Sequence, residues 1–181
     1  MNSVVVAVSR SAEHTFSKPN EESIKLIEGF GVEGDAHAGK TVKHRYLVKK
    51  DRTRPNIRQI HLIHAELLDE LDEKGFSVGP GQLGENITTR GVDLLALPTG
   101  TKLYIGSDVL IELTALRNPC VQIDDFQKGM LKEVLYKDED GNLVRRTGVM
   151  GIILKEGIVK PDDEIVVKLP PEPHHPLEYV W

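Results

Sequence analysis

Short runs of branched apolar residues recur along the chain, and glycine or proline separates most of them. Runs of this length and composition are typical of β-strands, and the glycines and prolines between them are typical of turns. The predicted strands cover residues 3–9, 24–26, 56–63, 85–88, 102–105, 109–113, 148–154 and 164–169. The second of these is ambiguous, because residues 21–28 could also form a short helix.

Two stretches have helical spacing instead. Residues 64–74 carry leucines on one stripe and acidic residues elsewhere, and Gly75 follows as a stop signal. Residues 121–136 carry apolar residues at roughly helical spacing, and Gly129 divides them into two short helices. With so few helices among many strands, we expect a mainly β fold, a β-barrel with a few peripheral helices, rather than a parallel α/β sheet.

Length and composition fit one globular domain. The chain has 181 residues, of which we assign 1–169 to the domain and 170–181 to a proline-rich tail whose aromatic end could dock onto the domain or a partner. A net charge of -5 argues against general nucleic-acid binding. No apolar run is long enough to cross a membrane, and the first residues lack the features of a signal peptide. We therefore expect a cytoplasmic protein that binds neither nucleic acid nor membrane.

Positive charge is concentrated between Lys40 and Arg58, where eight basic residues accompany a single acidic one, Asp51. Such a segment could attract an anionic ligand. The alternative is a solvated basic loop without a binding role, and the charges alone do not exclude it.

The only cysteine, Cys120, follows the predicted strand 109–113 and comes directly after Asn118 and Pro119, which mark the end of that strand. A thiolate is both a nucleophile and a ligand for soft metals, and Arg117 would favour the thiolate if it lay alongside. A lone free cysteine is also common as a small buried apolar residue. Both interpretations remain open at this point.

Other polar residues at loops and strand ends could converge on Cys120. They are Asp35 and His37 in a glycine-rich loop, Arg58 at the edge of the basic segment, and Asn86. Each side chain also has a simpler role open to it: capping turn amides for Asp35 and Asn86, pairing with a carboxylate for Arg58, or plain exposure to solvent.

Zinc binding and hydrolysis are alternatives that the residue spacing disfavours. The chain offers nitrogen and sulfur ligands at His37, His44, His61, His64 and Cys120. No C-x-x-C or H-E-x-x-H motif occurs, and the residues around Cys120 carry no protease signature. A nucleophile elbow for serine hydrolysis is also absent from the sequence.

Five short segments follow one another in a characteristic order. They read GVEGDAHAG at 31–39, RQIHLI at 58–63, GENIT at 84–88, RNPC at 117–120 and GVMG at 148–151. Together they resemble the MOSC domain, the module found at the C-terminus of molybdenum-cofactor sulfurases. The likeness runs over nearly the whole chain and is nearest to the stand-alone bacterial MOSC proteins.

This resemblance implies a β-barrel fold and a ligand that is the molybdenum cofactor (molybdopterin) or a molybdenum–sulfur species. It implies that Cys120 is the catalytic residue that carries sulfur or ligates molybdenum. His37, Arg58, Asn86 and Arg117 are then the candidates to hold the pterin and its phosphate. The aminotransferase-like domain of the fused sulfurases has no counterpart in this sequence, so no lysine is expected to hold pyridoxal phosphate covalently.

The resemblance leaves two functions open. In the first, the protein is a molybdenum-cofactor oxidoreductase that reduces N-hydroxylated bases and takes electrons from an electron-transfer protein. In the second, it is a sulfur carrier that accepts sulfur from a donor as a Cys120 persulfide and delivers it to metal–sulfur or molybdenum-cofactor assembly. The substrate stays unidentified, and a homodimer stays open.

Overall fold

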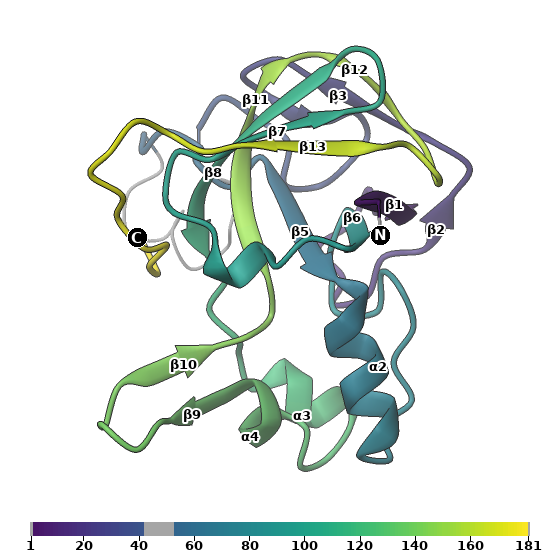
Figure 1. Cartoon of the computed structure of the whole chain (residues 1–181). Helices are drawn as coiled ribbons and strands as arrows, with labels where there is room; N and C mark the ends of the chain where they lie inside the picture. Colours follow the sequence, from purple (N-terminus) through teal and green to yellow (C-terminus); the bar gives the residue numbers. More distant parts are fainter. Residues whose placement is uncertain (1, 42–52, 181) are drawn as a thin grey trace.

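The computed structural model describes residues 2–41 and 53–180. Its largest feature is one eight-stranded sheet (Figure 1). In spatial order the strands are β13 (Ile165–Lys168), β7 (Lys102–Ile105), β8 (Val109–Leu116), β11 (Val149–Lys155), β5 (Ile60–His64), β6 (Ile87–Arg90), β1 (Val4–Ser9) and β2 (Asn20–Glu21). Neighbouring strands of this sheet are antiparallel, except that β5 and β6 are parallel.

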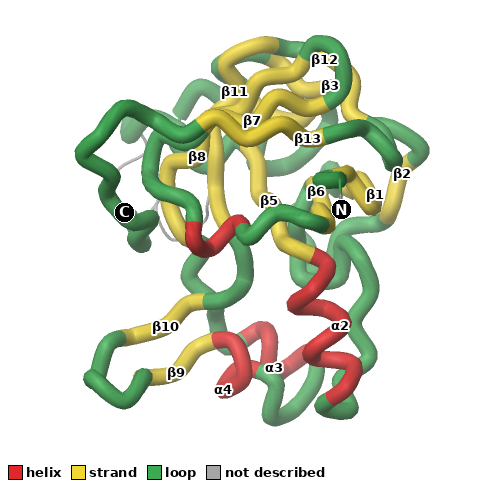
Figure 2. The backbone as a smooth tube through the Cα atoms, in the orientation of Figure 1, coloured by secondary structure: helices red, strands yellow, loops and turns green. Residues whose placement is uncertain are grey.

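Smaller elements flank this sheet. A three-stranded sheet consists of β12 (Gly157–Val159), β3 (Ile24–Ile27) and β4 (Gly31–Val32). The remaining elements are the hairpin β9 (Leu135–Lys137) and β10 (Leu143–Arg145), the helices α2 (Ala65–Glu73), α3 (Gln122–Phe126) and α4 (Leu131–Val134), and a 3-10 turn at Leu94–Ala96. Figure 2 shows that α2, α3, α4 and the hairpin of β9 and β10 lie together below the sheets. Helix α2 lies in the crossover that parallel strands such as β5 and β6 require.

The closed β-barrel that we expected is not found in the part of the chain that the structure describes. The eight-stranded sheet is open, with β13 and β2 at its edges. A single bridge between Val4 and Glu164 joins β1 to the residue before β13. Further along β1, however, Val8 pairs with Glu21 of β2 instead. The fold is therefore mainly β with few helices, and its main sheet is open.

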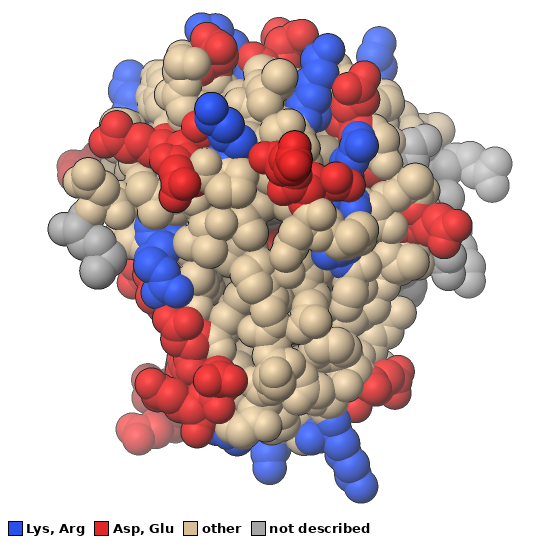
Figure 3. Space-filling model, turned by 90° about the vertical axis from the view of Figure 1, so that its right-hand side faces the viewer, with Lys and Arg blue, Asp and Glu red and all other residues tan. Residues whose placement is uncertain are grey.

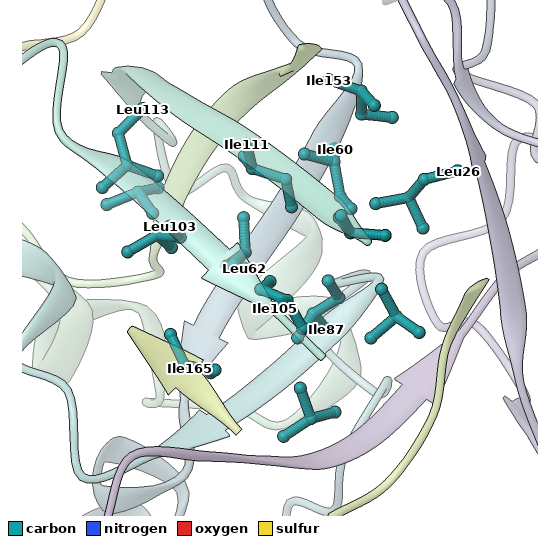
Figure 4. Packing of buried hydrophobic residues seen from close by; sticks show 14 of the residues in the cluster. Leu26, Ile60, Leu62, Ile87, Leu103, Ile105, Ile111, Leu113, Ile153 and Ile165 are labelled. Atoms are coloured by element: carbon teal, nitrogen blue, oxygen red, sulfur yellow. The ribbon is translucent and has the colours of Figure 1, made fainter. Parts of the chain in front are cut away.

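Strand β8 illustrates how the sheet buries its core. Its residues alternate strictly between buried and partly exposed, so that Val109, Ile111 and Leu113 face inward. Figure 4 shows Ile111 and Leu113 packed among apolar side chains of the neighbouring strands. A second apolar cluster packs the leucines of α2 against α3 and α4. Strand β5 belongs to both, since Leu62 lies in the first cluster and Ile63 in the second.

Most of the predicted elements are confirmed. Five predicted strands match β1, β7, β8, β11 and β13, and the helix predicted at 64–74 is α2. The strands predicted at 56–63 and 85–88 begin later, at Ile60 and Ile87. The helical alternative for residues 21–28 is wrong, because this stretch contains β2 and β3. In the described ranges, no helix has the length and apolar character of a membrane span.

Candidate functional site

A pocket with a volume of about 140 Å³ opens beside Cys120. Its walls come from segments that are far apart in the sequence, chiefly loops at the ends of β1, β4, β5, β6 and β8. All five residues that the resemblance singles out line this pocket: His37, Arg58, Asn86, Arg117 and Cys120. Folding therefore brings the predicted residues together in one place, whatever role each of them has.

Cys120 lies between the end of β8 and the start of α3. The backbone N–H of Arg117 donates to the carbonyl oxygen of Gly148 at 3.0 Å, which fixes the chain as it leaves the sheet. The Cys120 carbonyl oxygen then accepts a hydrogen bond from Ile123 N at 3.1 Å. The thiol is partly exposed, and its Sγ lies 3.5 Å from Oε1 of Gln122. Cys120 is thus not sealed in the apolar core.

Arg58 is a buried cation at the pocket wall, with 7% of its surface exposed. Its Nη2 donates to the carbonyl oxygen of Val180 at 2.8 Å, and its Cζ lies 5.2 Å from the centre of the Tyr179 ring. Burial lowers the pKa of Arg58, and Tyr179 opposes this effect. Within the described residues its Nε has no hydrogen-bond partner and no carboxylate pairs with it. The Nε atom of Arg58 is therefore a buried donor whose hydrogen bond is not made by any described residue.

Arg117 supplies a second guanidinium. Its Nη1 donates to the carbonyl oxygen of Leu83 at 2.5 Å, and its Cζ lies 6.0 Å from the centre of the Phe16 ring. Burial lowers the pKa of Arg117, and its electrostatic interactions with Cys120 and Glu85 oppose this effect. The pocket therefore places a permanently cationic side chain in the electrostatic field of the thiol.

A buried ion pair joins Lys18, which lines the pocket, to Asp35 of the glycine-rich loop. The Nζ atom of Lys18 lies 3.0 Å from Oδ1 of Asp35, and these side chains are 3% and 1% exposed. Asp35 also accepts hydrogen bonds from the backbone N–H groups of Ser11 and His37, both at 3.1 Å. Burial alone would raise the pKa of Asp35, but the hydrogen bond from His37 and the charge of Lys18 hold it well below its usual range. Asp35 thus has the simpler role of accepting hydrogen bonds from turn amides, and it also pairs with Lys18.

Asn86 lines the pocket, but its side-chain amide is hydrogen-bonded to the backbone of two other segments. Its Oδ1 accepts from His61 N at 3.1 Å, and its Nδ2 donates to the carbonyl oxygen of Ser9 at 3.1 Å. Both polar ends of the amide are used to hold β1 and β5 at the pocket edge. In this structure the backbone-capping role is the one that Asn86 performs.

Asn56 does the same for the loop that carries Arg58. Its Nδ2 donates to the carbonyl oxygens of His37 and Gly39, at 3.0 and 2.9 Å, and its Oδ1 accepts from Arg58 N at 3.0 Å. These three bonds tie the glycine-rich loop to the start of β5. The relative position of His37 and Arg58 therefore depends on Asn56.

Zinc binding finds no support in the part of the molecule that the structure describes. No group of three or more His, Cys, Asp or Glu residues in it could hold a metal ion. His61 is buried, and one ring nitrogen, Nε2, lies 2.7 Å from the carbonyl oxygen of Thr147. Burial lowers the pKa of His61 well below its usual value, so its ring is neutral. His44 and most of the predicted basic segment, residues 42–52, lie outside the described residues.

Sequence reasoning missed several pocket residues. They are Lys18, Asn56 and Gln122, together with His61 and Met150, which lie in two of the five characteristic segments but were not singled out for this pocket. Lys18 lies in a polar loop whose composition carries no signal beyond that of any exposed turn. Its burial depends on Asp35, which is seventeen positions away in sequence.

The pH dependence of stability should reveal Glu85, which is fully buried next to the pocket. Burial raises the pKa of Glu85 from 4.5 to about 7, against the attraction of Arg117. The folded protein therefore binds a proton that the unfolded chain releases above pH 4.5. The stability from this proton is complete below pH 4.5 and is lost as the pH rises through about 7.

Glu85→Gln removes this titration, so the variant should gain about 3 kcal/mol relative to the wild type between pH 4.5 and pH 8. Urea unfolding of both proteins at several pH values measures the difference. Glu73→Gln, at an exposed position of α2, is the matched control and should show no such trend. A difference between Glu85→Gln and wild type that stays constant with pH would refute the assignment.

Comparisons with known proteins fit this architecture. The family model described as the MOSC domain matches residues 35–166. The YuaD protein from Bacillus subtilis has a similar structure, with a TM-score of 0.75 and 22% identity over 94% of this chain and 98% of that one. YiiM from Geobacillus stearothermophilus has a TM-score of 0.62 and 15% identity, over 92% of this chain and 75% of that one. YiiM from Escherichia coli has a TM-score of 0.59 and 16% identity, over 95% of this chain and 73% of that one. A search of curated proteins found no match.

Proposed function

Because the chain belongs to the MOSC domain family, we propose that its pocket binds the molybdenum cofactor or a related molybdenum–sulfur species, with Cys120 as the thiolate that contacts molybdenum. One observation carries this proposal. The partly exposed sulfur of Cys120 shares a pocket with Arg58 and Arg117. A thiolate is a ligand for soft metals, and the neighbouring guanidinium groups donate hydrogen bonds to anions. Together they suit a ligand that combines a metal–sulfur centre with an anionic group.

The donor set of the pocket fits such a group. Thiolates favour soft, sulfur-bound metals, and guanidinium groups match the geometry of a phosphate. The buried Nε of Arg58 lacks a partner among the described residues, and a ligand oxygen would satisfy it. Lys18 is paired with Asp35, whereas Arg58 and Arg117 form no salt bridge with any described residue.

Each residue then has a distinct role. Arg58 and Arg117 would bind the phosphate, and His37 would contact the pterin from the glycine-rich loop. Asn86 would act indirectly, because its amide already holds the backbone of Ser9 and His61 in place. The bound cofactor would supply two-electron redox chemistry at molybdenum, while the protein binds it, orients it and limits access of water.

In this proposal the protein reduces N-hydroxylated substrates and receives electrons from a separate electron-transfer protein. The reaction needs Cys120 as a reduced thiol, and the cytoplasm keeps thiols in that state. Acidic and basic side chains are interspersed in the upper part of the face shown in Figure 3, and no continuous basic patch covers the atoms in view, which argues against nucleic acid as the partner of that face.

The exposure of the Cys120 thiol also favours a second candidate function, sulfur transfer. The Cys120 thiolate would attack the terminal sulfur of a donor persulfide, and the donor would leave as a thiolate when its S–S bond breaks. Cys120 would then carry the persulfide to a cofactor-assembly protein. Such a carrier would need no bound molybdenum.

Expression in a host that makes molybdenum cofactor separates these functions. We expect stoichiometric molybdenum in the wild type and its loss in Cys120→Ser, because the hydroxyl is a poor ligand for a soft metal. The control is Val121→Ala, since Val121 is the neighbouring residue and is 67% exposed. A metal-free protein with cyanolysable sulfur that Cys120→Ser lacks would support the carrier instead. A wild type with neither molybdenum nor labile sulfur would contradict both.

A further inference from the structure

The tail beyond β13 returns to the pocket and docks beside it. Leu177 is buried, with 5% exposure, and Thr99 N donates to the carbonyl oxygen of His175 at 2.8 Å. Leu116 N, at the end of β8, donates to the carbonyl oxygen of Glu178 at 2.8 Å. These contacts hold the tail next to the strand that leads to Cys120.

Two arginines contact the next tail residue, Tyr179. The Cζ atoms of Arg58 and Arg145 each lie 5.2 Å from the centre of its ring. Arg145 also donates from Nε to Oδ1 of Asn118, a pocket residue, at 2.8 Å. The tail is therefore linked to the pocket wall by Arg58 directly and by Arg145 through Asn118.

The tail contacts Arg58 through two residues that do not themselves line the pocket. Val180 accepts a hydrogen bond from Nη2, and the Tyr179 ring lies against the guanidinium. Neither tail residue lines the pocket, whereas Arg58 does. The Nε atom remains buried and without a hydrogen-bond partner in the described ranges. A planar guanidinium held in this way has lost its rotational freedom before a ligand arrives.

We propose that Tyr179 and Val180 are positioning residues that fix the Arg58 guanidinium for an anionic group in the pocket. This inference rests on the proposed function, since it takes Arg58 as a hydrogen-bond donor to an anionic ligand. The opposite arrangement, in which the tail competes with the ligand for Arg58, would put tail residues in the pocket or engage the Nε atom. The described tail residues, 170–180, do neither. The two arrangements predict opposite effects when the contact is removed.

The test is calorimetric titration of the full chain with inorganic phosphate. Tyr179→Ala should weaken binding about tenfold, the effect of freeing one immobilised side chain. Arg58→Ala should weaken binding at least as much. Adding Tyr179→Ala to Arg58→Ala should change nothing further, because the tyrosine acts through the arginine. A residue that only stabilised the fold would not show this dependence.

Tyr104→Ala is the matched control, because Tyr104 is 41% exposed on β7 and does not line the pocket. If Tyr179→Ala fails to fold, Tyr179→Leu keeps the bulk, lacks the π face and should weaken binding similarly. Unchanged or tighter phosphate binding in the folded Tyr179 variant, with binding still dependent on Arg58, overturns the positioning role alone. A wild type that binds no phosphate, or binds it equally well as Arg58→Ala, overturns the proposed anion site as well.

Discussion

Replacing Asp35 with asparagine is expected to lower the free energy of unfolding by about 3–5 kcal/mol, the usual cost of removing one partner of a buried ion pair. Asparagine has nearly the same shape but leaves the charge of Lys18 uncompensated. Lys18 and Asp35 are 3% and 1% exposed, so water cannot solvate the remaining cation in the folded state. Urea unfolding at pH 7 measures the loss.

The pH dependence identifies the mechanism. Because the folded pKa of Asp35 lies below its unfolded value of 3.8, the carboxylate contributes stability above pH 3.8 and loses it as the pH falls further. The gap between the wild type and Asp35→Asn should therefore narrow below pH 3.8. Asp72→Asn, at an exposed position of α2, should cost little at any pH. An Asp35→Asn variant as stable as Asp72→Asn would show that the ion pair is not a major stabilising contact.

Gly148→Ala is expected to be equally damaging, with a loss of about 3–5 kcal/mol or failure to fold. Gly148 has φ +91°, and an added Cβ would overlap the carbonyl oxygen of Leu62 and come within 2.7 Å of Cγ1 of Ile63. Both obstacles belong to β5 at the centre of the sheet, so they cannot move aside cheaply. The carbonyl oxygen of Gly148 also accepts the Arg117 N–H, so the pocket should be distorted.

Gly75→Ala separates the two causes of this loss. Gly75 has the same φ of +91°, but nothing lies within 4 Å of its added Cβ. It should therefore cost only the strain of the left-handed backbone, about 1 kcal/mol. Thermal or urea unfolding of both variants gives the comparison. Equal losses in the two would mean that the close approach of β11 to β5 has no energetic consequence.

The strands were predictable where a local pattern decides them. The residues of β8 alone show the alternation of buried and partly exposed positions, and the residues of α2 alone show its leucine stripe. Strand β9 was missed because Leu135 and Tyr136 continue an apolar spacing that also fits a helix, and their strand pairing depends on residues 143–145. The open sheet was missed for a similar reason. Its edge depends on long-range pairings of β1, with Glu21 at one end and with Glu164 at the other, and a local pattern does not contain them.

Five residues of the pocket were predictable from the sequence, but their tertiary contacts were not. The resemblance pointed to five residues that the fold brings to one pocket, although it carries no information on how their polar atoms are used. The amide oxygen and nitrogen of Asn86 both form hydrogen bonds with backbone groups. Arg58 donates a hydrogen bond to a tail residue more than a hundred positions later in the sequence. Contacts of this kind depend on tertiary folding, so only the structure could reveal them.

In the proposed function, the sulfur of Cys120 contacts a bound molybdenum species. X-ray absorption at molybdenum tests it directly on protein isolated from a cofactor-producing host, compared with Cys120→Ser and with the control Val121→Ala. We predict a sulfur neighbour of molybdenum in the wild type and in Val121→Ala that is missing in Cys120→Ser, or loss of the metal from that variant. Equal molybdenum content and the same sulfur neighbours in Cys120→Ser would contradict the claim.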